Sequence, residues 1–450
     1  MNLEQTTMKK VAWRLMPYLC LLFFVAFIDR VNVGFAALHM NADLGLSATA
    51  FGTGAGMFFI GYFFFEVPSN MLLKRFGIRF TIARIMIAWG LISASFALVQ
   101  NETQFYVLRF LLGVAEAGFL PGIIYYFTLW LPAGYRGRLI AVFVMMIPAS
   151  TVIGAPLSTW IMTAMEGVMG YRGWQWMFVI EALPAILLGF SVYRMLPESP
   201  AMAPWLNDAE KGWLIGRLEH EGAVKAEHLP AGWWKAVANL RVIKITIVYA
   251  SICFGIYGVG FWIAQIIKGF GQSDQTTGFI TAIPYLLASV CMIFWGRHSD
   301  YKKERVWHVA LPAWFSAIAF VAAYLTLSMP VLAVCALSCC IIGIFCALPP
   351  YWTYPTLFFS GSAAAIGIAV VNSIGNLAGY FGPTLVGILK DTTGDFASGM
   401  LLLGAVMLIC GIAALSLRKD FRLEAMARSE REEEPNKAAP LSAVFQATKA

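Results

Sequence analysis

Two pairs of ionisable residues lie inside long apolar runs of this sequence, where a charge is costly and usually has a function. Asp29 and Arg30 are neighbours in the first run, and Arg109 and Glu116 lie in the fourth. A buried arginine suits a carboxylate ligand, because its planar guanidinium matches two oxygens at once. A carboxyl group beside it can take up and release a proton. These four residues therefore indicate a site where anion binding and protonation meet.

The spacing within each pair decides which side chains can face one site. Neighbouring residues on a helix are about 100° apart, so Asp29 and Arg30 can border one cavity without pointing the same way. Arg109 and Glu116 lie on one helix face but about 10 Å apart, too far for a direct contact. The alternatives are an Asp29–Arg30 ion pair that seals the first helix against a neighbour, and separate polar partners for Arg109 and Glu116.

Neutral polar residues supply the remaining candidates, because the second half of the chain has no charge in the middle of an apolar run. Amide and phenol side chains can bind carboxylate oxygens or hydroxyl groups. The candidates for ligand contacts beside Arg30 are Tyr125, Tyr257, Gln265, Asn372 and Asn376. Asn376 is the strongest candidate of the second half. Glu66, Arg84 and Glu181 lie nearer the ends or flanks of their runs, and we interpret them as structural or interfacial.

The composition places these residues in a membrane protein. The chain has 450 residues, of which 59% are hydrophobic and 13% charged, whereas a soluble domain has about 25% charged residues. About 20 apolar residues cross a bilayer as a helix, so the apolar residues suffice for roughly a dozen spans. These proportions exclude an ordinary cytosolic enzyme and a disulfide scaffold. The net charge of +7 is divided among short loops and forms no basic stripe for nucleic acid.

No motif indicates a cofactor, a metal site or an enzymatic activity. The eight cysteines all lie in apolar runs without a C-x-x-C pair, so we interpret them as small buried hydrophobic residues. Neither H-E-x-x-H nor G-x-x-x-x-G-K-[ST] occurs, so nothing indicates a zinc protease or ATP hydrolysis. We therefore expect a protein that is not an enzyme and has no cofactor.

Twelve apolar segments are predicted to be membrane-spanning helices. They lie near 15–38, 50–72, 80–99, 104–130, 138–163, 174–196, 242–267, 276–296, 307–327, 331–358, 363–389 and 397–417. Asn207 and Glu210, in the long polar stretch after the sixth segment, are spaced as a capping box for a short surface helix. Lys and Arg gather in alternate loops, so we expect both termini on the cytoplasmic side of the inner membrane.

Landmarks of the first half recur in the second at a nearly constant offset. Residues 70–79 match 296–305, and residues 154–156 match 381–383. The predicted fold is therefore an all-α membrane protein with twelve transmembrane helices in two pseudo-symmetric six-helix bundles. The predicted domains are a bundle at 1–196, a cytoplasmic linker with a surface helix at 197–241, a bundle at 242–418 and a disordered cytoplasmic tail at 419–450.

Three stretches carry a resemblance to a known family. Phe27 to Asn32 (FIDRVN), Glu66 to Asn70 (EVPSN) and Arg109 to Gly118 (RFLLGVAEAG) resemble the anion:cation symporter family of the major facilitator superfamily. The resemblance covers nearly the whole chain. That family includes bacterial galactonate, tartrate, phthalate and hydroxyphenylacetate transporters, and its fold consists of two six-helix bundles.

The resemblance also implies roles for the charged residues. It implies symport of an organic anion with protons, with Arg30 as the arginine that binds the substrate carboxylate. Asp29 and Glu116 match the family's protonatable acids, and Arg109 matches the arginine linked to that glutamate. Asn376 falls where family members contact the substrate.

One motif departs from the superfamily pattern. The loop after the second span usually carries an aspartate in G-x-x-x-D-R-x-G-R, but Lys74 occupies that position here, whereas the second copy keeps its acid as Asp300. We therefore expect a gating salt bridge in the second half, from Asp300 and Arg305. The gate of the first half, around Arg75 and Arg79, is expected to be altered. The tartrate- and phthalate-like branch is similarly altered, which favours that branch.

Together these observations predict a proton-coupled symporter that imports a small organic carboxylate by alternating access. The aromatic walls fit either an aromatic acid or a hydroxylated sugar acid. An anion exchanger, a uniporter of the same fold and a transporter-like sensor stay open as alternatives. We expect the partners to be the organic anion, protons and the lipid bilayer, with no nucleic acid, and we expect a monomer.

Overall fold

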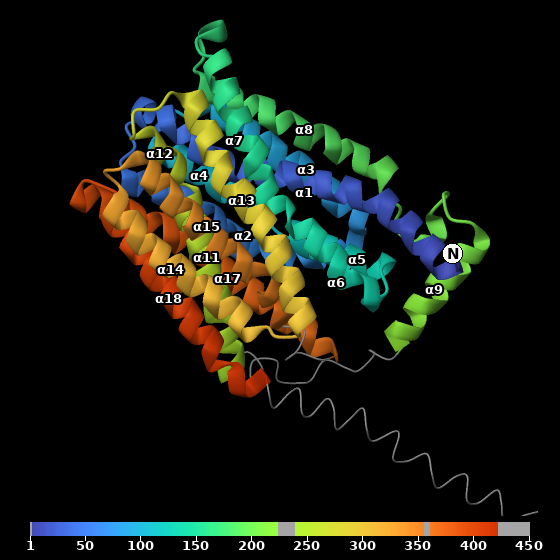
Figure 1. Ribbon diagram of the computed structural model, residues 1–450. Helices are drawn as coiled ribbons and strands as arrows, with labels where there is room; N and C mark the ends of the chain where they lie inside the picture. The colour runs from blue at the N-terminus through green and yellow to red at the C-terminus, as the bar shows by residue number, and fades with distance from the viewer. Residues whose placement is uncertain (1, 224–238, 355–360, 422–450) are drawn as a thin grey trace, which may run out of the picture.

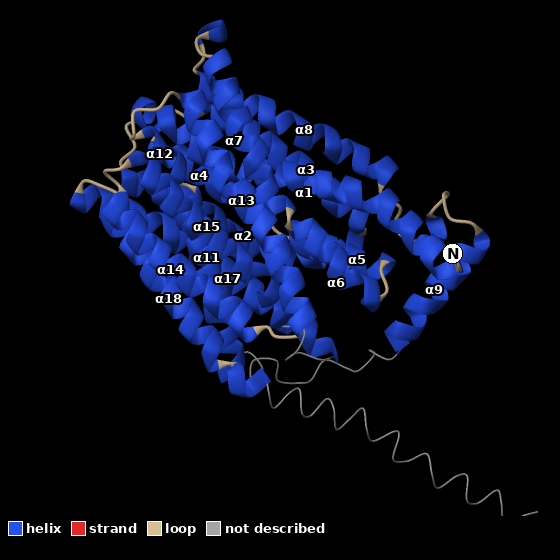
Figure 2. Cartoon of the chain, viewed as in Figure 1, coloured by secondary structure: helices blue, strands red, loops and turns tan. Residues whose placement is uncertain are grey.

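The computed structural model describes residues 2–223, 239–354 and 361–421, and this part of the chain consists of helices joined by short loops (Figure 2). The first half contains α1 (Leu3–Leu44), α2 (Ala48–Phe76), α3 (Ile78–Ser95), α4 (Glu102–Glu116), α5 (Phe119–Trp130), α6 (Ala133–Val144), α7 (Met146–Ala164) and α8 (Gly173–Met195). The surface helix α9 (Asp208–Ala223) follows. The second half contains α11 (Leu240–Gly260), α12 (Ile263–Lys268), α13 (Asp274–Lys302), α14 (Val306–Thr326), α15 (Pro330–Tyr351), α17 (Gly361–Thr393) and α18 (Ala397–Ser416). Of the predicted tail at 419–450, residues 422–450 lie outside the described residues.

Eleven helical stretches of the described chain are long and apolar enough to cross a membrane. The helix α17 coincides with the remaining predicted segment, 363–389. Three of the eleven stretches each combine two helices: α4 with α5, α6 with α7, and α11 with α12.

The break between α4 and α5 has a local cause. Pro121 has no amide hydrogen, and its ring would clash with the carbonyl group of Ala117 in a continuous helix. Gly118 makes the turn at φ +87°, a left-handed conformation that a side chain disfavours. The break leaves Glu116 as the last residue of α4.

The two bundles meet along two pairs of long helices (Figure 1). The helix α2 packs along α17, and α7 packs along α13. The sequence landmarks relate the second span to the eighth and the fifth to the eleventh. The two contacts are therefore equivalent under the duplication, as a pseudo-symmetric pair of bundles requires.

The contact between α2 and α17 depends on close approach of the two backbones. A Cβ atom on Gly52 would lie only 2.3 Å from the carbonyl oxygen of Pro383. Close by, the carboxylate of Asp391 accepts hydrogen bonds from the backbone N–H groups of Ala48 and Thr49, at 3.1 and 2.7 Å. The start of α2 is therefore capped by a residue of the other half.

We expect the substitution Gly52→Ala to force α2 and α17 apart and to destabilise the protein by about 1–3 kcal/mol, as overpacking does in a close-packed interior. Gly137→Ala is the matched control, because a Cβ atom at Gly137 would meet no atom within 4 Å. Thermal unfolding of both purified variants in detergent, followed by tryptophan fluorescence, measures the difference. Equal unfolding temperatures would contradict the prediction.

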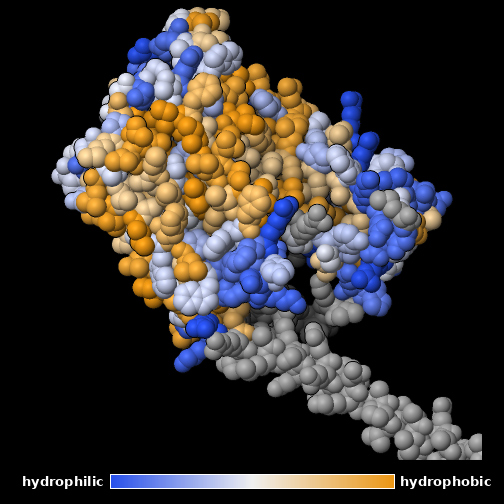
Figure 3. Space-filling view, viewed as in Figure 1, coloured by the Kyte–Doolittle hydropathy of each residue, from blue (hydrophilic) through white to orange (hydrophobic). Residues whose placement is uncertain are grey.

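The outer surface has the distribution of apolar residues that a bilayer requires. Hydrophobic side chains cover much of the bundle in the view of Figure 3, and hydrophilic residues gather towards its ends. On α8, for example, Leu187 is 66% and Phe190 61% exposed. Such large exposed apolar surfaces fit contact with lipid.

The surface helix α9 is attached to the start of α1. Lys10 Nζ donates to the carboxylate of Glu210 at 2.8 Å. The backbone N–H groups of Asn207 and Glu210 each donate to the other's side chain, at 3.0 and 2.8 Å, so the predicted capping box is confirmed. The hydrogen bonds from Lys10 and Asn207 hold the pKa of the Glu210 carboxyl below its ordinary value.

Candidate functional site

A buried ion pair stands at the centre of the candidate site. Arg30 on α1 donates through Nη2 to Glu116 at the end of α4, and through Nη1 to the hydroxyl group of Tyr257 on α11 at 3.0 Å. Arg30 is 7% and Glu116 2% exposed. The pair thus joins two helices of the first half, and Tyr257 connects it to the second half.

Aromatic rings surround the guanidinium group of Arg30. Its central carbon lies 4.6 Å from the ring centre of Phe27, 5.0 Å from that of Phe58 and 5.8 Å from that of Tyr62. Cations are attracted to the faces of such rings, most strongly where water is excluded. Among the described residues, Arg30 Nε has no hydrogen-bond partner. The aromatic surround therefore fixes the guanidinium group without using all of its donors.

The side chain of Asp29 is directed away from this pair. Its carboxylate accepts hydrogen bonds from Trp89 Nε1 at 2.6 Å and Ser93 Oγ at 3.3 Å, both on α3. Asp29 is 3% exposed. Two neutral donors therefore hold this buried acid, within the first half and on a different side of α1 from Arg30.

Arg109 lies near the pair but has a different hydrogen-bond partner from the one that the resemblance implies. Its Nη2 donates to the carbonyl oxygen of Ala55 on α2 at 2.9 Å, and its guanidinium carbon lies 5.4 Å from the ring centre of Phe58. Glu116 instead receives its hydrogen bond from Arg30. Arg109 and Arg30 thus flank the same phenylalanine ring, and Arg30 is the direct partner of the acid.

Asn372 and Asn376 belong to a second polar cluster, which bridges the two halves. Asn372 Nδ2 donates to one oxygen of Glu66 on α2 at 2.8 Å, and Ser373 Oγ donates to the other. Asn372 Oδ1 accepts from Tyr249 Oη at 3.2 Å and from Asn376 Nδ2 at 3.0 Å. Glu66 is only 1% exposed. We name these five residues the Glu66 cluster.

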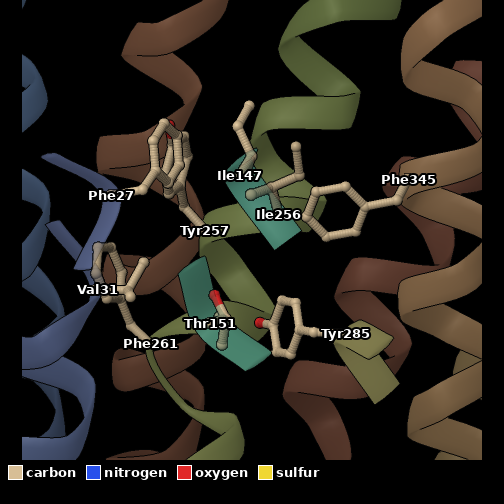
Figure 4. A pocket seen from close by; sticks show the side chains of 10 residues that line it. Phe27, Val31, Ile147, Thr151, Ile256, Tyr257, Phe261, Tyr285 and Phe345 are labelled. Carbon is tan, nitrogen blue, oxygen red and sulfur yellow. The ribbon is translucent and has the colours of Figure 1, made fainter. Parts of the chain in front are cut away.

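A narrow cavity lies between the halves beside Tyr257 (Figure 4). Its polar groups include the hydroxyl groups of Tyr257, Thr151 and Tyr285. Its lining residues are Phe27, Val31, Ile147, Thr151, Ile256, Tyr257, Gly260, Phe261, Tyr285 and Phe345. Arg30 and Glu116 do not line this cavity, but Tyr257, which accepts the hydrogen bond from Arg30, connects it to the pair. The cavity walls are mainly aromatic and aliphatic.

Two predicted contact residues lie apart from these groups. Tyr125 on α5 is 43% exposed, whereas the neighbouring Tyr126 is buried and donates to the carbonyl oxygen of Pro197 at 2.8 Å. Gln265 lies in the short helix α12, and its buried Nε2 has no hydrogen-bond partner in the part of the chain that the structure describes. Neither residue lines the cavity beside Tyr257.

The arginines of the two loop motifs have different partners. In the second half, Arg305 Nη1 forms an ion pair with Asp300 at 2.6 Å and donates to Ser299 Oγ at 2.9 Å. In the first half, the guanidinium group of Arg75 lies 5.2 Å from the ring centre of Phe76. The side chain of Lys74 lies outside the described residues.

Glu198 provides an acid to the altered motif of the first half, which sequence reasoning missed. Its carboxylate accepts hydrogen bonds from the backbone N–H groups of Ile78 and Arg79, each at 3.2 Å, at the start of α3. Arg79 Nε donates to the carbonyl oxygen of Leu196 in the same connection. An acid at a helix start is favourable because free N–H groups point at it. The only sequence signal is the short Leu196–Pro200 stretch (LPESP) after the sixth span.

No group of three histidine, cysteine, aspartate or glutamate side chains is placed to hold a metal ion in the part of the chain that the structure describes. The site consists of two buried arginines, Arg30 and Arg109, several buried acids and neutral hydrogen-bonding groups. Such a set can bind an anion and exchange protons.

The family is shown by comparison with known proteins. A model of the Major Facilitator Superfamily matches residues 19–383. The chain belongs to this superfamily. It is a multi-pass membrane transport protein rather than an enzyme. The family and the fold class predicted from the sequence are thereby confirmed.

Relatives and a solved structure agree with this assignment. A protein of Agrobacterium vitis named "Putative tartrate transporter" is 48% identical over 423 residues, 93% of this chain and 92% of that protein. A quinolone resistance transporter of Acinetobacter baumannii is 41% identical over 411 residues, covering 91% and 94%. The xylose transporter XylE of E. coli, partially occluded and inward open, has the same fold, with a TM-score of 0.71 at 16% identity over 90% and 98% of the two chains. The compounds in these names differ, so the names support transport without fixing a substrate.

Proposed function

We propose that this protein is a proton-coupled symporter that imports a small organic carboxylate by alternating access of its two bundles. The observation that supports this most strongly is the buried Arg30–Glu116 pair, whose arginine also donates to Tyr257 in the wall of the cavity between the halves. A guanidinium group whose partner is an acid can exchange that partner for a substrate carboxylate, because both present the same pair of oxygens.

Protonation of Glu116 provides the coupling in this proposal. An ionised Glu116 occupies Arg30, and a substrate carboxylate that displaced it would leave a buried charge without a partner. When Glu116 takes up a proton, Arg30 loses its counter-ion and is free for the anion. Proton and anion binding then favour each other reciprocally, which is the thermodynamic condition for symport.

The other charged residues have supporting roles in the proposal. Arg109 adds a second positive charge beside Phe58, which favours an anion at the site. Asp29 is a second candidate for carrying a proton, because its hydrogen-bond partners Trp89 and Ser93 are both neutral. Asn376 and Tyr257 are the proposed substrate contacts from the second half. Tyr125 is left out, because its side chain is exposed.

The orientation of the protein in the membrane is part of the proposed function. We place the protein in the inner membrane as a monomer, with both termini and the 197–241 linker on the cytoplasmic side. The Lys and Arg residues of alternate loops support this orientation. The bundles at 1–196 and 242–418 rock against each other about the central site.

Uptake by proteoliposomes that contain the purified protein tests the function. With an acidic outside and an alkaline inside, we expect at least one small organic acid of a radiolabelled panel to accumulate above its outside concentration. A protonophore should abolish this accumulation, because it removes the proton gradient. Uptake that requires an internal anion would indicate an exchanger, and equilibration without accumulation would indicate a uniporter. Binding without uptake would indicate a sensor, and each of these three results contradicts symport.

A further inference from the structure

The Glu66 cluster contains a buried carboxylate whose role the coupling scheme does not explain. Both oxygens of Glu66 accept hydrogen bonds from the opposite half, through Asn372 and Ser373. These donors are an amide and a hydroxyl group, both uncharged, and the hydroxyl groups of a sugar acid are uncharged donors as well. The carboxylate of Glu66 is therefore the acceptor at the centre of the cluster, and its uncharged donors come from the second half of the chain.

One face of α2 connects this cluster to Arg30. Phe59, Tyr62 and Glu66 are spaced three and four residues apart, so they share a face of the helix. The ring centre of Phe59 lies 4.3 Å from that of Tyr257, and the ring centre of Tyr62 lies 5.8 Å from the guanidinium carbon of Arg30. Glu66 follows Tyr62 by about 6 Å along the helix axis. Tyr62 thus has Arg30 beside its ring and Glu66 one helical turn beyond it.

The hydrogen bonds of Glu66 cross the surface along which the halves must move. When α2 and α17 separate at this level, the carboxylate loses both protein donors together. A buried carboxylate without donors is costly, so other donors must replace them. Hydroxyl groups on adjacent carbon atoms of a substrate can supply two donors to the two oxygens of one carboxylate.

We propose that Glu66, with Asn372 and Ser373, forms a subsite that recognises hydroxyl groups of the substrate. The substrate class is then a polyhydroxylated carboxylate rather than an aromatic acid. Its carboxylate binds Arg30, and its hydroxyl groups donate to Glu66, one helical turn beyond the Tyr62 ring that lies beside Arg30. This inference rests on the proposed function, because Arg30 must hold the carboxylate for the hydroxyl groups to reach Glu66.

Matched acids that differ only in hydroxyl groups test the subsite. One series is tartrate, malate and succinate, and another is glycerate, lactate and propionate, each with fewer hydroxyl groups in that order. In proteoliposomes of the wild type, kcat/KM should fall along at least one series. Glu66→Gln replaces one acceptor oxygen by a donor, so it should reduce the preference for the most hydroxylated acid by about tenfold to a hundredfold.

Glu181→Gln is the matched control for this substitution. Glu181 is 4% exposed and also accepts from two neutral side chains, Ser158 Oγ at 2.6 Å and Asn32 Nδ2 at 3.0 Å. All three of these residues belong to the first half, so the preference should be retained in this variant. If Glu66→Gln does not fold, Ser373→Ala removes one of the donors at the same place and should also change the preference.

The possible outcomes separate this inference from a purely structural role. If Glu66→Gln lowers the uptake rate of every acid by the same factor, Glu66 contributes a contact between the halves but does not recognise the substrate. That result would overturn the subsite. An unchanged preference in both cluster variants, or a wild type that prefers the acids without hydroxyl groups, would overturn it as well. Failure of the proposed function would give a different result, because no acid of either series would then show proton-driven uptake that depends on Arg30.

Discussion

The Arg30→Lys variant should lose roughly a hundredfold or more of the wild-type rate of substrate uptake, because the truncated contact is a buried, hydrogen-bonded charge pair. Lysine keeps the positive charge but presents a compact ammonium group in place of a planar fork. It therefore cannot bind two carboxylate oxygens side by side. It also loses the stacking of the guanidinium group against Phe27 and Phe58. Initial rates of uptake in proteoliposomes under a fixed proton gradient measure the loss.

A control must separate this loss from misfolding. Removing Arg30 alone leaves Glu116 buried without its partner, which is strongly destabilising when the acid stays charged. The double variant Arg30→Ala/Glu116→Gln removes both charges together, and we expect it to unfold near the wild-type temperature but not to transport. Calorimetric titration with the transported acid completes the test. Binding of wild-type strength to the double variant would contradict the carboxylate role of Arg30.

The fold could be predicted from the sequence because membrane insertion leaves a strong local signal. Apolar runs of about 20 residues, alternate basic loops and a repeated loop motif each depend on neighbouring residues alone. The breaks inside the spans were harder to predict. The break at Gly118 depends on the proline three residues later, and an isolated proline is often tolerated within a membrane helix.

The partners within the site depend on contacts that the sequence does not encode locally. The adjacency of Asp29 and Arg30 predicts two directions around α1, and the structure shows both: Asp29 accepts hydrogen bonds from α3, and Arg30 donates to α4. It does not predict that Arg30, rather than Arg109, binds Glu116. That choice depends on how α1 and α4 are rotated against each other, which is a property of the packed bundle.

Glu66 shows that the partner of a buried charge on another helix cannot be predicted from the residues around it. The apolar run near 50–72 suggests that Glu66 lies close to the end of its span. The candidate membrane span of α2 ends at Leu73, close to this prediction, and Glu66 contacts Asn372 on the other half, which agrees with an interfacial residue. The available signal was the charge itself, within an otherwise apolar stretch after Tyr62 (YFFFE).

The Glu116→Gln variant should lose proton-driven accumulation while still exchanging substrate across the membrane. Glutamine has the shape of a protonated glutamate and carries no charge at any pH. Arg30 then has no counter-ion and stays free for the substrate, so binding no longer requires a proton. Uphill uptake under a pH gradient and exchange of labelled for unlabelled substrate, measured on the same proteoliposomes, separate the two properties.

The coupling role of Glu116 also predicts the direction in which substrate affinity changes with pH. In the wild type, affinity should fall as the pH rises, because deprotonated Glu116 competes with the substrate for Arg30. In Glu116→Gln this competition is absent, so affinity should be nearly constant over the same pH range. Glu181→Gln is the matched control, since it neutralises a buried acid that contacts Ser158 and Asn32 but not Arg30, and it should keep the wild-type slope.

Each alternative has its own result in these titrations. If Asp29 rather than Glu116 carries the coupling proton, the slope persists in Glu116→Gln and disappears in Asp29→Asn. If the protein is an exchanger, affinity stays independent of pH in the wild type as well. Retained uphill accumulation in Glu116→Gln would overturn the coupling role of this acid, because a neutral side chain cannot release a proton at the cytoplasmic side.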